Sequence, residues 1–368
     1  MKDLRIIIAG GGTGGHIFPA IAIANALKRI IPTVKILFVG ANGKMEMEKV
    51  PQEGYEIVGL DIAGFNRSNI WKNFSLPFKL LKSLWKAKSL VRSFNPHVVV
   101  GVGGYASFPM LRAAQKAMVP TLIQEQNSFA GKSNQILAKH AKAVCVAYEK
   151  MDQFFPSQKI VLTGNPVRAA IAHSMASRSE GQHWLNMNPD KMTLLVVGGS
   201  LGAKSINEAI DKHLEELTNE GIQIIWQTGK PYHSIAEQRV TNNGSVKVFD
   251  FIREMDLAYA AADVVVSRAG ALAIAELCIV AKPVVFVPYP YAAEDHQTSN
   301  AAALVMHNAA EMVRDSDVMA ELIPKVKLLF KDELAQSVMK RNLKAMAITD
   351  ADDRIANQIL NIAKEDMS

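Results

Sequence analysis

Long apolar runs and a cysteine framework are both missing from this chain of 368 residues. No stretch approaches the roughly 18 consecutive apolar residues that a membrane-spanning helix needs. The first apolar run, residues 4–9, is too short and too poorly flanked to be a signal peptide. The two cysteines, Cys145 and Cys278, lie far apart in apolar surroundings, which predicts buried thiols in a reducing compartment. We therefore expect a cytoplasmic protein with no segment that crosses a membrane.

Acidic residues are absent between Asp61 and Glu125, although the chain carries 35 acidic and 41 basic residues in all. Nine basic residues fall in this interval: Arg67, Lys72, Lys79, Lys82, Lys86, Lys88, Arg92, Arg112 and Lys116. In the segment 67–92, tryptophans are interleaved with lysines, which favours an anionic membrane surface as a partner. An amphipathic helix packed on a sheet is the alternative explanation for part of the apolar content. No RNA- or DNA-binding module is recognisable, so no nucleic acid partner is expected.

Apolar, β-rich runs alternate with stretches of helical period, as in parallel sheets that helices cover on both faces. The expected strands are residues 4–10, 35–40, 56–60, 97–101, 120–124 and 143–147, then 193–198, 222–227, 246–249, 263–267 and 283–287. After residue 308 only helical signals remain. Because the chain is about twice as long as an ordinary domain, we predict an α/β protein with two doubly wound parallel-sheet domains, residues 1–165 and 166–345. A C-terminal helix in 346–368 should dock back on one of them.

Glycine loops follow four of the expected strands. The first, residues 10–15, satisfies G-x-G-x-x-G between a strand and a helix, so its bare amides suit a diphosphate. A dinucleotide site would also need an acidic residue at the end of the second strand. That strand ends at Gly40 and the nearest carboxylates are Glu46 and Glu48, which disfavours NAD. The other loops are 101–105, 198–199 and 267–271, and four of them predict a cleft that handles more than one phosphate group.

Seven motifs in collinear order resemble one family, the bacterial N-acetylglucosaminyltransferases of peptidoglycan synthesis. They are GGGTGGHIFPA (10–20), GVGGYASFP (101–109), QEQNS (124–128), GNPVR (164–168), GGSLGAKSIN (198–207), SRAGALAIAE (267–276) and PYPYAAEDHQTSNA (288–301). The resemblance implies a GT-B fold, in which two Rossmann-like domains face a cleft, and an inverting transfer of GlcNAc from UDP-GlcNAc. The implied acceptor is the C4 hydroxyl of MurNAc in undecaprenyl-linked lipid I. It also implies peripheral attachment to the cytoplasmic face of the inner membrane, with no cofactor.

The same resemblance assigns residues to the donor. Ser200 should touch the diphosphate, Ile252 should meet the uracil through its backbone, and Glu276 should bind the ribose hydroxyls. The remaining residues implied to bind substrate are Thr13, Gly14, Gly15, Asn127, Arg168, Ala271, Leu272, Ala273, Ile274, Ala275 and Gln297, of which Gln297 should reach the sugar. The chemistry agrees, because a carboxylate suits a cis-diol and a helix N-terminus suits a diphosphate. Three departures stand out: Gln124 where many relatives have His, Ala273 where many have Thr, and His296 where some have the first Gln of a pair.

The acceptor hydroxyl needs a base, and two residues are candidates. His16 follows the first glycine loop, where the positive end of a helix dipole lowers an imidazole pKa and keeps the ring neutral. Glu125 follows the fifth strand and ends the long acid-free stretch. The triplets Asp315-Ser316-Asp317 and Asp350-Ala351-Asp352 precede helices, so we interpret them as helix caps and expect no metal site. Two other functions stay open, a UDP-GlcNAc 2-epimerase and a non-enzymatic membrane- or RNA-binding protein.

Overall fold

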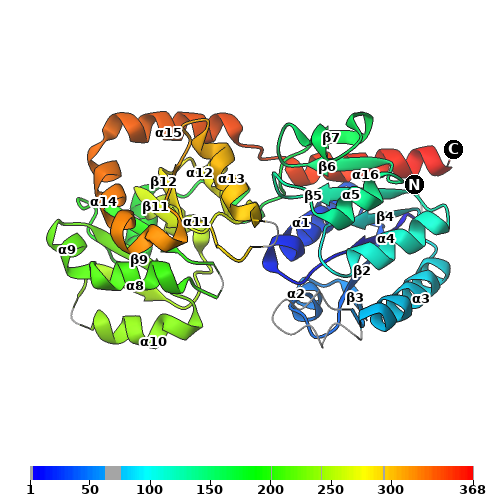
Figure 1. Cartoon of the computed structure of the whole chain (residues 1–368), viewed down its shortest axis with the longest axis horizontal. Coiled ribbons are helices and arrows are strands. Elements are labelled where there is room, and N and C mark those ends of the chain that lie inside the picture. The colour runs from blue at the N-terminus through cyan, green and yellow to red at the C-terminus, as the bar shows by residue number, and fades with distance from the viewer. Residues whose placement is uncertain (1–2, 63–75, 200, 242, 293–294, 368) are drawn as a thin grey trace. The chain divides into compact units, whose positions relative to one another are not determined.

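The computed structural model describes residues 3–62, 76–199, 201–241, 243–292 and 295–367. Its contacts divide the chain into two compact units (Figure 1). The first unit comprises Met1–Arg168 and Asp350–Ser368, and the second comprises Ala169–Thr349. The C-terminal segment thus returns to the first unit after the chain has completed the second.

The first unit is built on a seven-stranded parallel sheet with the order β3-β2-β1-β4-β5-β6-β7. Its strands are β1 (Arg5–Ala9), β2 (Lys35–Ala41), β3 (Glu56–Leu60), β4 (Val98–Gly101), β5 (Thr121–Glu125), β6 (Ala143–Val146) and β7 (Ile160–Leu162). Six of the seven confirm the predicted runs to within one residue at each end. The seventh, β7, was not predicted, because it is three residues long and only partly buried at the sheet edge.

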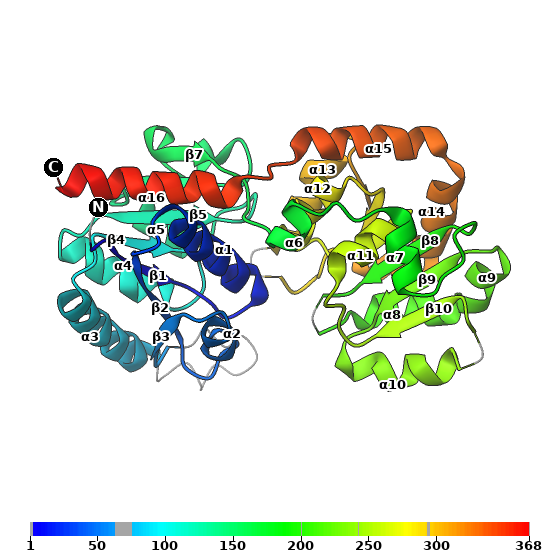
Figure 2. The same cartoon turned by 180° about the vertical axis from the view of Figure 1, so that it is seen from behind.

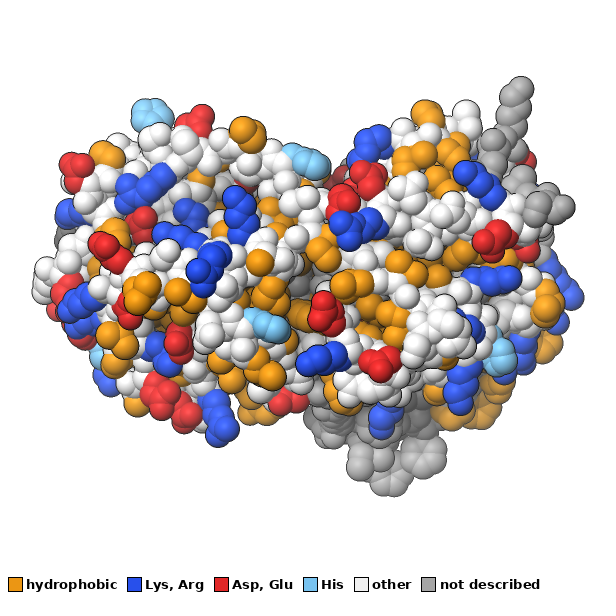
Figure 3. Space-filling view, turned by 90° about the horizontal axis from the view of Figure 1, so that it is seen from above, with side chains coloured by type: hydrophobic (Ala, Val, Ile, Leu, Met, Phe, Trp, Pro, Cys, Tyr) orange, Lys and Arg blue, Asp and Glu red, His pale blue; other side chains and the backbone are white. Residues whose placement is uncertain are grey.

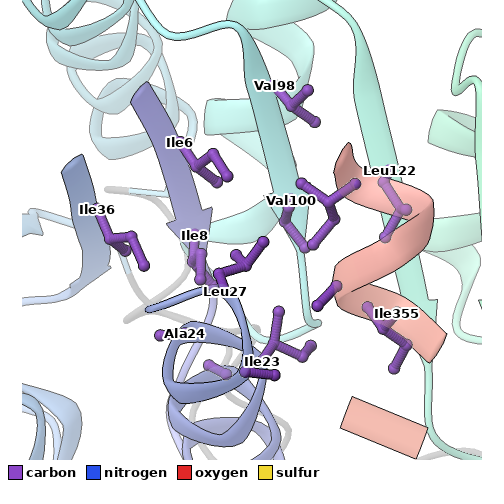
Figure 4. Close-up of a cluster of buried hydrophobic side chains, with 14 of the residues drawn as sticks. Ile6, Ile8, Ile23, Ala24, Leu27, Ile36, Val98, Val100, Leu122 and Ile355 are labelled. Atoms are coloured by element: carbon purple, nitrogen blue, oxygen red, sulfur yellow. The ribbon is translucent and has the colours of Figure 1, made fainter. Parts of the chain in front are cut away.

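Helices cover both faces of this sheet. The elements on one face are α1 (Gly14–Ile30), α2 (Glu46–Gln52) and α16 (Ala351–Met367). Those on the other are α3 (Leu76–Phe94), α4 (Ser107–Lys116) and α5 (Lys132–Ala138). Figure 4 shows Ile23 and Leu27 of α1 packed beside Ile8 of β1, with Ile355 of α16 in the same cluster. Full burial of an aliphatic side chain of this size contributes about 1.5–3 kcal/mol, so α16 is firmly held along α1 (Figure 2).

The second unit has a six-stranded parallel sheet with the order β10-β9-β8-β11-β12-β13. Its strands are β8 (Thr193–Val197), β9 (Gln223–Gln227), β10 (Val246–Phe249), β11 (Val264–Ser267), β12 (Val284–Phe286) and β13 (Glu311–Met312). The first five confirm the predicted runs. The expectation of helices alone after residue 308 is wrong, because the two-residue β13 adds to the sheet edge beside β12.

Ten helices belong to the described part of the second unit, besides short 3-10 turns. They are α6 (Ala169–Ala172), α7 (Arg178–Trp184), α8 (Lys204–Lys212), α9 (Leu214–Asn219), α10 (Lys230–Arg239), α11 (Met255–Ala261), α12 (Ala271–Val280), α13 (His296–Val305), α14 (Val318–Lys331) and α15 (Glu333–Met346). Apolar side chains of α8, α9, α10 and α14 fill one face of the sheet.

The strand orders place the glycine loops at particular positions. Each sheet reverses its direction of growth once, between β1 and β4 in the first unit and between β8 and β11 in the second. Ligands of open α/β sheets bind at such switch points, outside the carboxyl ends of the strands. All four predicted loops follow one of these four strands, so each unit carries a pair of glycine loops where a ligand is expected.

Candidate functional site

The first glycine loop is held by a buried carboxylate. Glu46, the first residue of α2, is 1% exposed. Its Oε2 accepts a hydrogen bond of 2.8 Å from the amide of Gly12, and its Oε1 accepts one of 2.9 Å from the amide of Ala41. A nucleotide diphosphate would need the same loop amide. The geometry therefore adds to the sequence argument against a dinucleotide at this loop.

Four of the predicted residues lie together at the start of α1. Thr13 precedes the helix, Gly14 and Gly15 begin it, and His16 follows. The Nδ1 atom of His16 lies 3.3 Å from the hydroxyl of Thr13, and the imidazole is half-buried. A Cβ built on Gly103 would lie 2.7 Å from His16 Cδ2, so the ring packs on the backbone of the second loop. The imidazole is thereby held between the two glycine loops of the first unit.

Glu125 has a different environment from His16. It is 2% exposed, and its Oε1 accepts from the amide and side chain of Asn127 at 3.1 and 3.2 Å. Its Oε2 accepts from the Gly131 amide at 3.2 Å and from Asn134 at 2.8 Å. Four N–H donors on one carboxylate order the loop after β5, and proton transfer to Glu125 would disrupt this network. These hydrogen bonds give Glu125 and Asn127 a role in shaping the loop.

Gln124, the first departure from the family pattern, is fully buried. It donates to Asn165 at 3.0 Å and contacts Gln126, whose side chain donates to the Val102 carbonyl at 2.7 Å. These amides connect the strand end at 124–126 to the second glycine loop. Gln124 therefore belongs to the internal hydrogen-bond network of this loop.

The second unit contains a cavity of about 660 Å³ at its own switch point, within the usual size range of small-molecule sites. It is lined by Val197, Gly198, Gly199, Leu201, Gly202, Ala203, Lys204, Ser205, Glu208, Ser267, Arg268, Gly270, Ala273, Tyr289, Tyr291, Gln297 and Asp315. Of the predicted donor residues, Ala273 and Gln297 are in this lining, while Ser200 lies outside the described residues. The N-terminal end of α12 opens on the cavity through Gly270 and Ala273.

The sequence did not predict the polar cluster that Arg268, Asp315 and Ser205 form in this cavity. Arg268 donates to Asp315 at 2.6 Å and to the hydroxyl of Ser205 at 3.2 Å, and Ser205 donates to Asp315 at 2.6 Å. The interpretation of Asp315 as a helix cap is wrong, because its carboxylate pairs with Arg268 instead. The two residues are 47 positions apart, and no local pattern connects them.

The loop after β12 is anchored to the same cluster. Arg268 donates to the carbonyls of Val287 and Pro288 at 3.1 Å, and its guanidinium lies 5.6 Å from the ring of Tyr289. Gln297, predicted to reach the sugar, accepts from the Tyr289 amide at 2.9 Å. Arg268 and Gln297 therefore fix the cavity wall that carries Tyr289.

The other predicted substrate residues are not in the cavity lining. Glu276 is 6% exposed and accepts from the Tyr259 hydroxyl at 3.3 Å, so it is not on a solvated helix face as such a residue normally would be. Ile252 donates its amide to Gln227 at 2.9 Å, so a contact with uracil would use its carbonyl oxygen. Ala271, Leu272, Ile274 and Ala275 complete the first turns of α12. Arg168 is half-buried and ends the first unit.

The two cysteines are buried, as predicted. Burial raises the pKa of both thiols, Cys145 and Cys278, to about 12. Since the thiolate is the reactive form, neither cysteine suits nucleophilic chemistry. Within the described ranges, no three His, Cys, Asp or Glu side chains are grouped to hold a metal ion.

Two Rossmann-like units, each with glycine loops at its switch point, have the architecture of the GT-B fold. Residues 6–146 match the glycosyltransferase family 28 N-terminal domain, and residues 193–355 match the glycosyltransferase family 28 C-terminal domain. The chain belongs to glycosyltransferase family 28.

Similar proteins cover nearly the whole chain. One from Bacteroides thetaiotaomicron is 50% identical over 99% of both chains, and one from Cytophaga hutchinsonii is 52% identical over 99% of this chain and 98% of the other. Both are named UDP-N-acetylglucosamine--N-acetylmuramyl-(pentapeptide) pyrophosphoryl-undecaprenol N-acetylglucosamine transferase.

Solved structures show the same fold. The crystal structure of Acinetobacter baumannii MurG is 28% identical, with a TM-score of 0.78 over 97% of this chain and 99% of that chain. A UDP-GlcNAc 2-epimerase from Neisseria meningitidis bound to UDP-GlcNAc has a TM-score of 0.67 at 11% identity, over 98% of this chain and 100% of that chain. The second likeness concerns the fold alone.

Proposed function

We propose that this protein moves GlcNAc from UDP-GlcNAc to the C4 hydroxyl of MurNAc in undecaprenyl-diphospho-MurNAc-pentapeptide, converting lipid I to lipid II with inversion at the sugar. The observation that carries the proposal is the identity of about half of all residues, over almost the full length, with relatives whose names state this donor and acceptor. The cavity of the second unit and the half-buried imidazole of the first supply the two chemical functions that the reaction requires.

The donor half of the reaction belongs to the cavity of the second unit. The N-terminus of α12 and the backbone of the loop after β8 receive the diphosphate, because unpaired helix amides and the helix dipole stabilise negative charge. Their effect is greatest on the UDP leaving group, where charge develops as the bond to the sugar breaks. Glu276 binds the ribose hydroxyls, Ile252 meets the uracil and Gln297 reaches the sugar.

The acceptor half belongs to His16. Its imidazole takes the proton of the C4 hydroxyl as that oxygen attacks C1 of GlcNAc, and UDP departs with the electron pair of the C1–O bond. The attack comes from the face opposite UDP, which inverts the configuration at C1. Fixing the ring between two glycine loops holds it in one orientation, which is what a positioned base requires.

The transfer assay uses UDP-GlcNAc and a lipid I analogue, with and without EDTA. We expect one UDP and one disaccharide product per turnover in both conditions, because the α12 start and the glycine-loop backbone stabilise UDP without a metal. Formation of a 2-epimer from UDP-GlcNAc without acceptor would overturn the proposal in favour of an epimerase. Complete loss of transfer in EDTA, with the fold intact, would refute the metal-independent part.

For the location we propose peripheral attachment to the cytoplasmic face of the inner membrane. No helix in the described part of the chain is long and apolar enough to cross a bilayer. On α3, Phe78, Leu81 and Trp85 are 77%, 56% and 79% exposed. A groove of about 730 Å³ between α3 and α4 is lined by Leu81, Leu84, Trp85, Lys88, Arg92, Ala113, Lys116 and Ala117. Exposed aromatic and aliphatic groups beside cations suit an anionic lipid surface.

The charge of the described part of this segment is not all available to lipid. Lys82 pairs with Asp61 at 2.8 Å, and Lys86 donates to the carbonyl of Gly59 at 2.7 Å. Residues 67–75 of the predicted segment lie outside the described residues. Lys88, Arg92 and Lys116 nevertheless line the groove between α3 and α4. On the face drawn in Figure 3, basic side chains are interspersed with acidic ones. We therefore assign the membrane contact to the α3–α4 side of the first unit.

A further inference from the structure

Glu46 is a buried carboxylate that the transfer reaction does not use directly. It lies 34 residues from Gly12 in sequence, yet its two oxygens accept from the Gly12 and Ala41 amides at 2.8 and 2.9 Å. The carboxylate thus connects the end of β2 to the first glycine loop. A buried anion with two backbone donors is a strong local restraint, because hydrogen bonds to charged groups exceed neutral ones in strength.

Two glycines make room for this carboxylate. A Cβ on Gly11 would lie 2.3 Å from Glu46 Cδ, and one on Gly40 would lie 2.5 Å from Glu46 Cγ. Any other residue at these positions would push the side chain out of its place. The loop amide that could bind a phosphate group in a fold of this kind is therefore occupied by the protein's own anion.

The restraint extends to His16 through backbone contacts. The Gly11 amide donates to the carbonyl of Gly103 at 3.3 Å, and a Cβ on Gly104 would lie 2.1 Å from the Gly11 carbonyl oxygen. Gly103 in turn packs against the imidazole of His16. A continuous series of contacts therefore leads from Glu46 through the first and then the second glycine loop to the His16 ring. The two loops contact each other through their backbones, with no side chain between them.

We propose that Glu46 is a positioning residue for His16, and that the Gly12 amide binds no phosphate of either substrate. Its carboxylate fixes the first glycine loop, and the loop fixes the second loop and the ring that packs on it. The kinetic part of this inference rests on the proposed transfer reaction. The test therefore includes measurements that do not depend on transferase activity.

The variant is Glu46→Gln, and Glu48→Gln is the matched control. Glu48 lies on the same helix, its side chain is 71% exposed, and it contacts only Lys49 and Gln52 among the described groups. A glutamine at 46 presents an NH₂ group to one of the two backbone amides. We expect kcat to fall roughly 10-fold or more, the effect of one lost charge-assisted hydrogen bond. The KM for UDP-GlcNAc should stay unchanged, and Glu46→Asp should recover part of kcat.

Two NMR measurements test the inference without turnover. The ring signals of His16 should shift in Glu46→Gln and Glu46→Asp but not in Glu48→Gln, and inorganic pyrophosphate should leave the Gly12 amide signal of the unmodified protein in place. An unmoved His16 signal in a folded Glu46 variant would overturn the positioning role. Movement of the Gly12 amide with pyrophosphate would overturn the claim about phosphate. If the unmodified protein has no transferase activity, the proposed function fails while these two results still decide the inference.

Discussion

Replacement of Asp315 by asparagine tests the polar cluster of the donor cavity. Asp315 Oδ1 accepts from Arg268 and from Ser205, both at 2.6 Å. The side chains of the ion pair are only 12% and 22% exposed, for Arg268 and Asp315 respectively. Asparagine keeps the size and one acceptor but removes the charge, so Arg268 loses its anionic partner while it stays largely buried.

The expected loss follows from the geometry. A hydrogen bond to a charged group contributes about 1.5–3 kcal/mol, and breaking a fully buried pair costs about 3–5 kcal/mol. The remaining exposure and the retained acceptor reduce this, so we expect Asp315→Asn to lower the free energy of unfolding by about 2 kcal/mol. For a unit of this size that corresponds to about 4–8 °C in Tm. Because Arg268 also holds the loop after β12, the KM for UDP-GlcNAc should rise roughly 10-fold.

The control is Asp317→Asn, two positions further along the same turn. Asp317 accepts only from the neighbouring Ser316 hydroxyl among the interactions described, at 3.0 Å, and that bond is exposed. Both variants are compared by thermal unfolding and by initial rates across UDP-GlcNAc concentrations. Equal Tm and equal KM in the two variants would refute the reasoning, since it requires that the burial of the Arg268 pair, and not the lost charge alone, causes the effect.

Three further variants test the remaining assignments. His16→Ala should lower kcat by about 10²-fold or more while UDP-GlcNAc affinity is kept; near-normal turnover would remove His16 from the base role. Glu276→Ala should raise the donor KM by roughly 10-fold or more, and Tyr259→Phe, which removes only the internal hydrogen bond, should not; an unchanged affinity in titration calorimetry would leave Glu276 a structural residue. Trp85→Ala should weaken sedimentation with anionic vesicles, and binding should fall with salt because each nearby lysine contributes about 1 kcal/mol; equal binding to neutral vesicles would contradict the membrane assignment.

The fold could be predicted to a large extent, because strands buried on both faces of a parallel sheet must be continuously apolar. Runs such as 98–101 and 264–267 are unambiguous for this reason. The two edge strands β7 and β13 were missed for the converse reason. They are short and only partly buried, so their pairing depends on the neighbouring strand and not on their own composition.

The candidate site could be predicted only where its residues share a local motif. The glycine loops could be predicted because the glycines that a tight turn requires are neighbours in the sequence. The contacts of the carboxylates could not be predicted in this way, because what a carboxylate does depends on which donors surround it after folding. Asp315 was expected to cap a helix but pairs with Arg268. Glu125 stays a candidate base, and its carboxylate also accepts hydrogen bonds from its own loop. No local pattern indicates that Glu46 accepts from the Gly12 amide.

The same strand–glycine–helix device serves different chemistry in the two units. In the first unit, Glu46 occupies the loop amide, so the loop becomes a rigid support on which the His16 ring is held. In the second unit, the loop after β8 and the start of α12 line a cavity, and the two basic side chains of its lining are paired, Arg268 with Asp315 and Lys204 with Glu208. Backbone amides and a helix N-terminus therefore remain the main groups for a diphosphate in that cavity. In the proposed reaction, the glycine loop of the first unit supports the base and that of the second unit stabilises the leaving group, so each unit serves one of the two substrates.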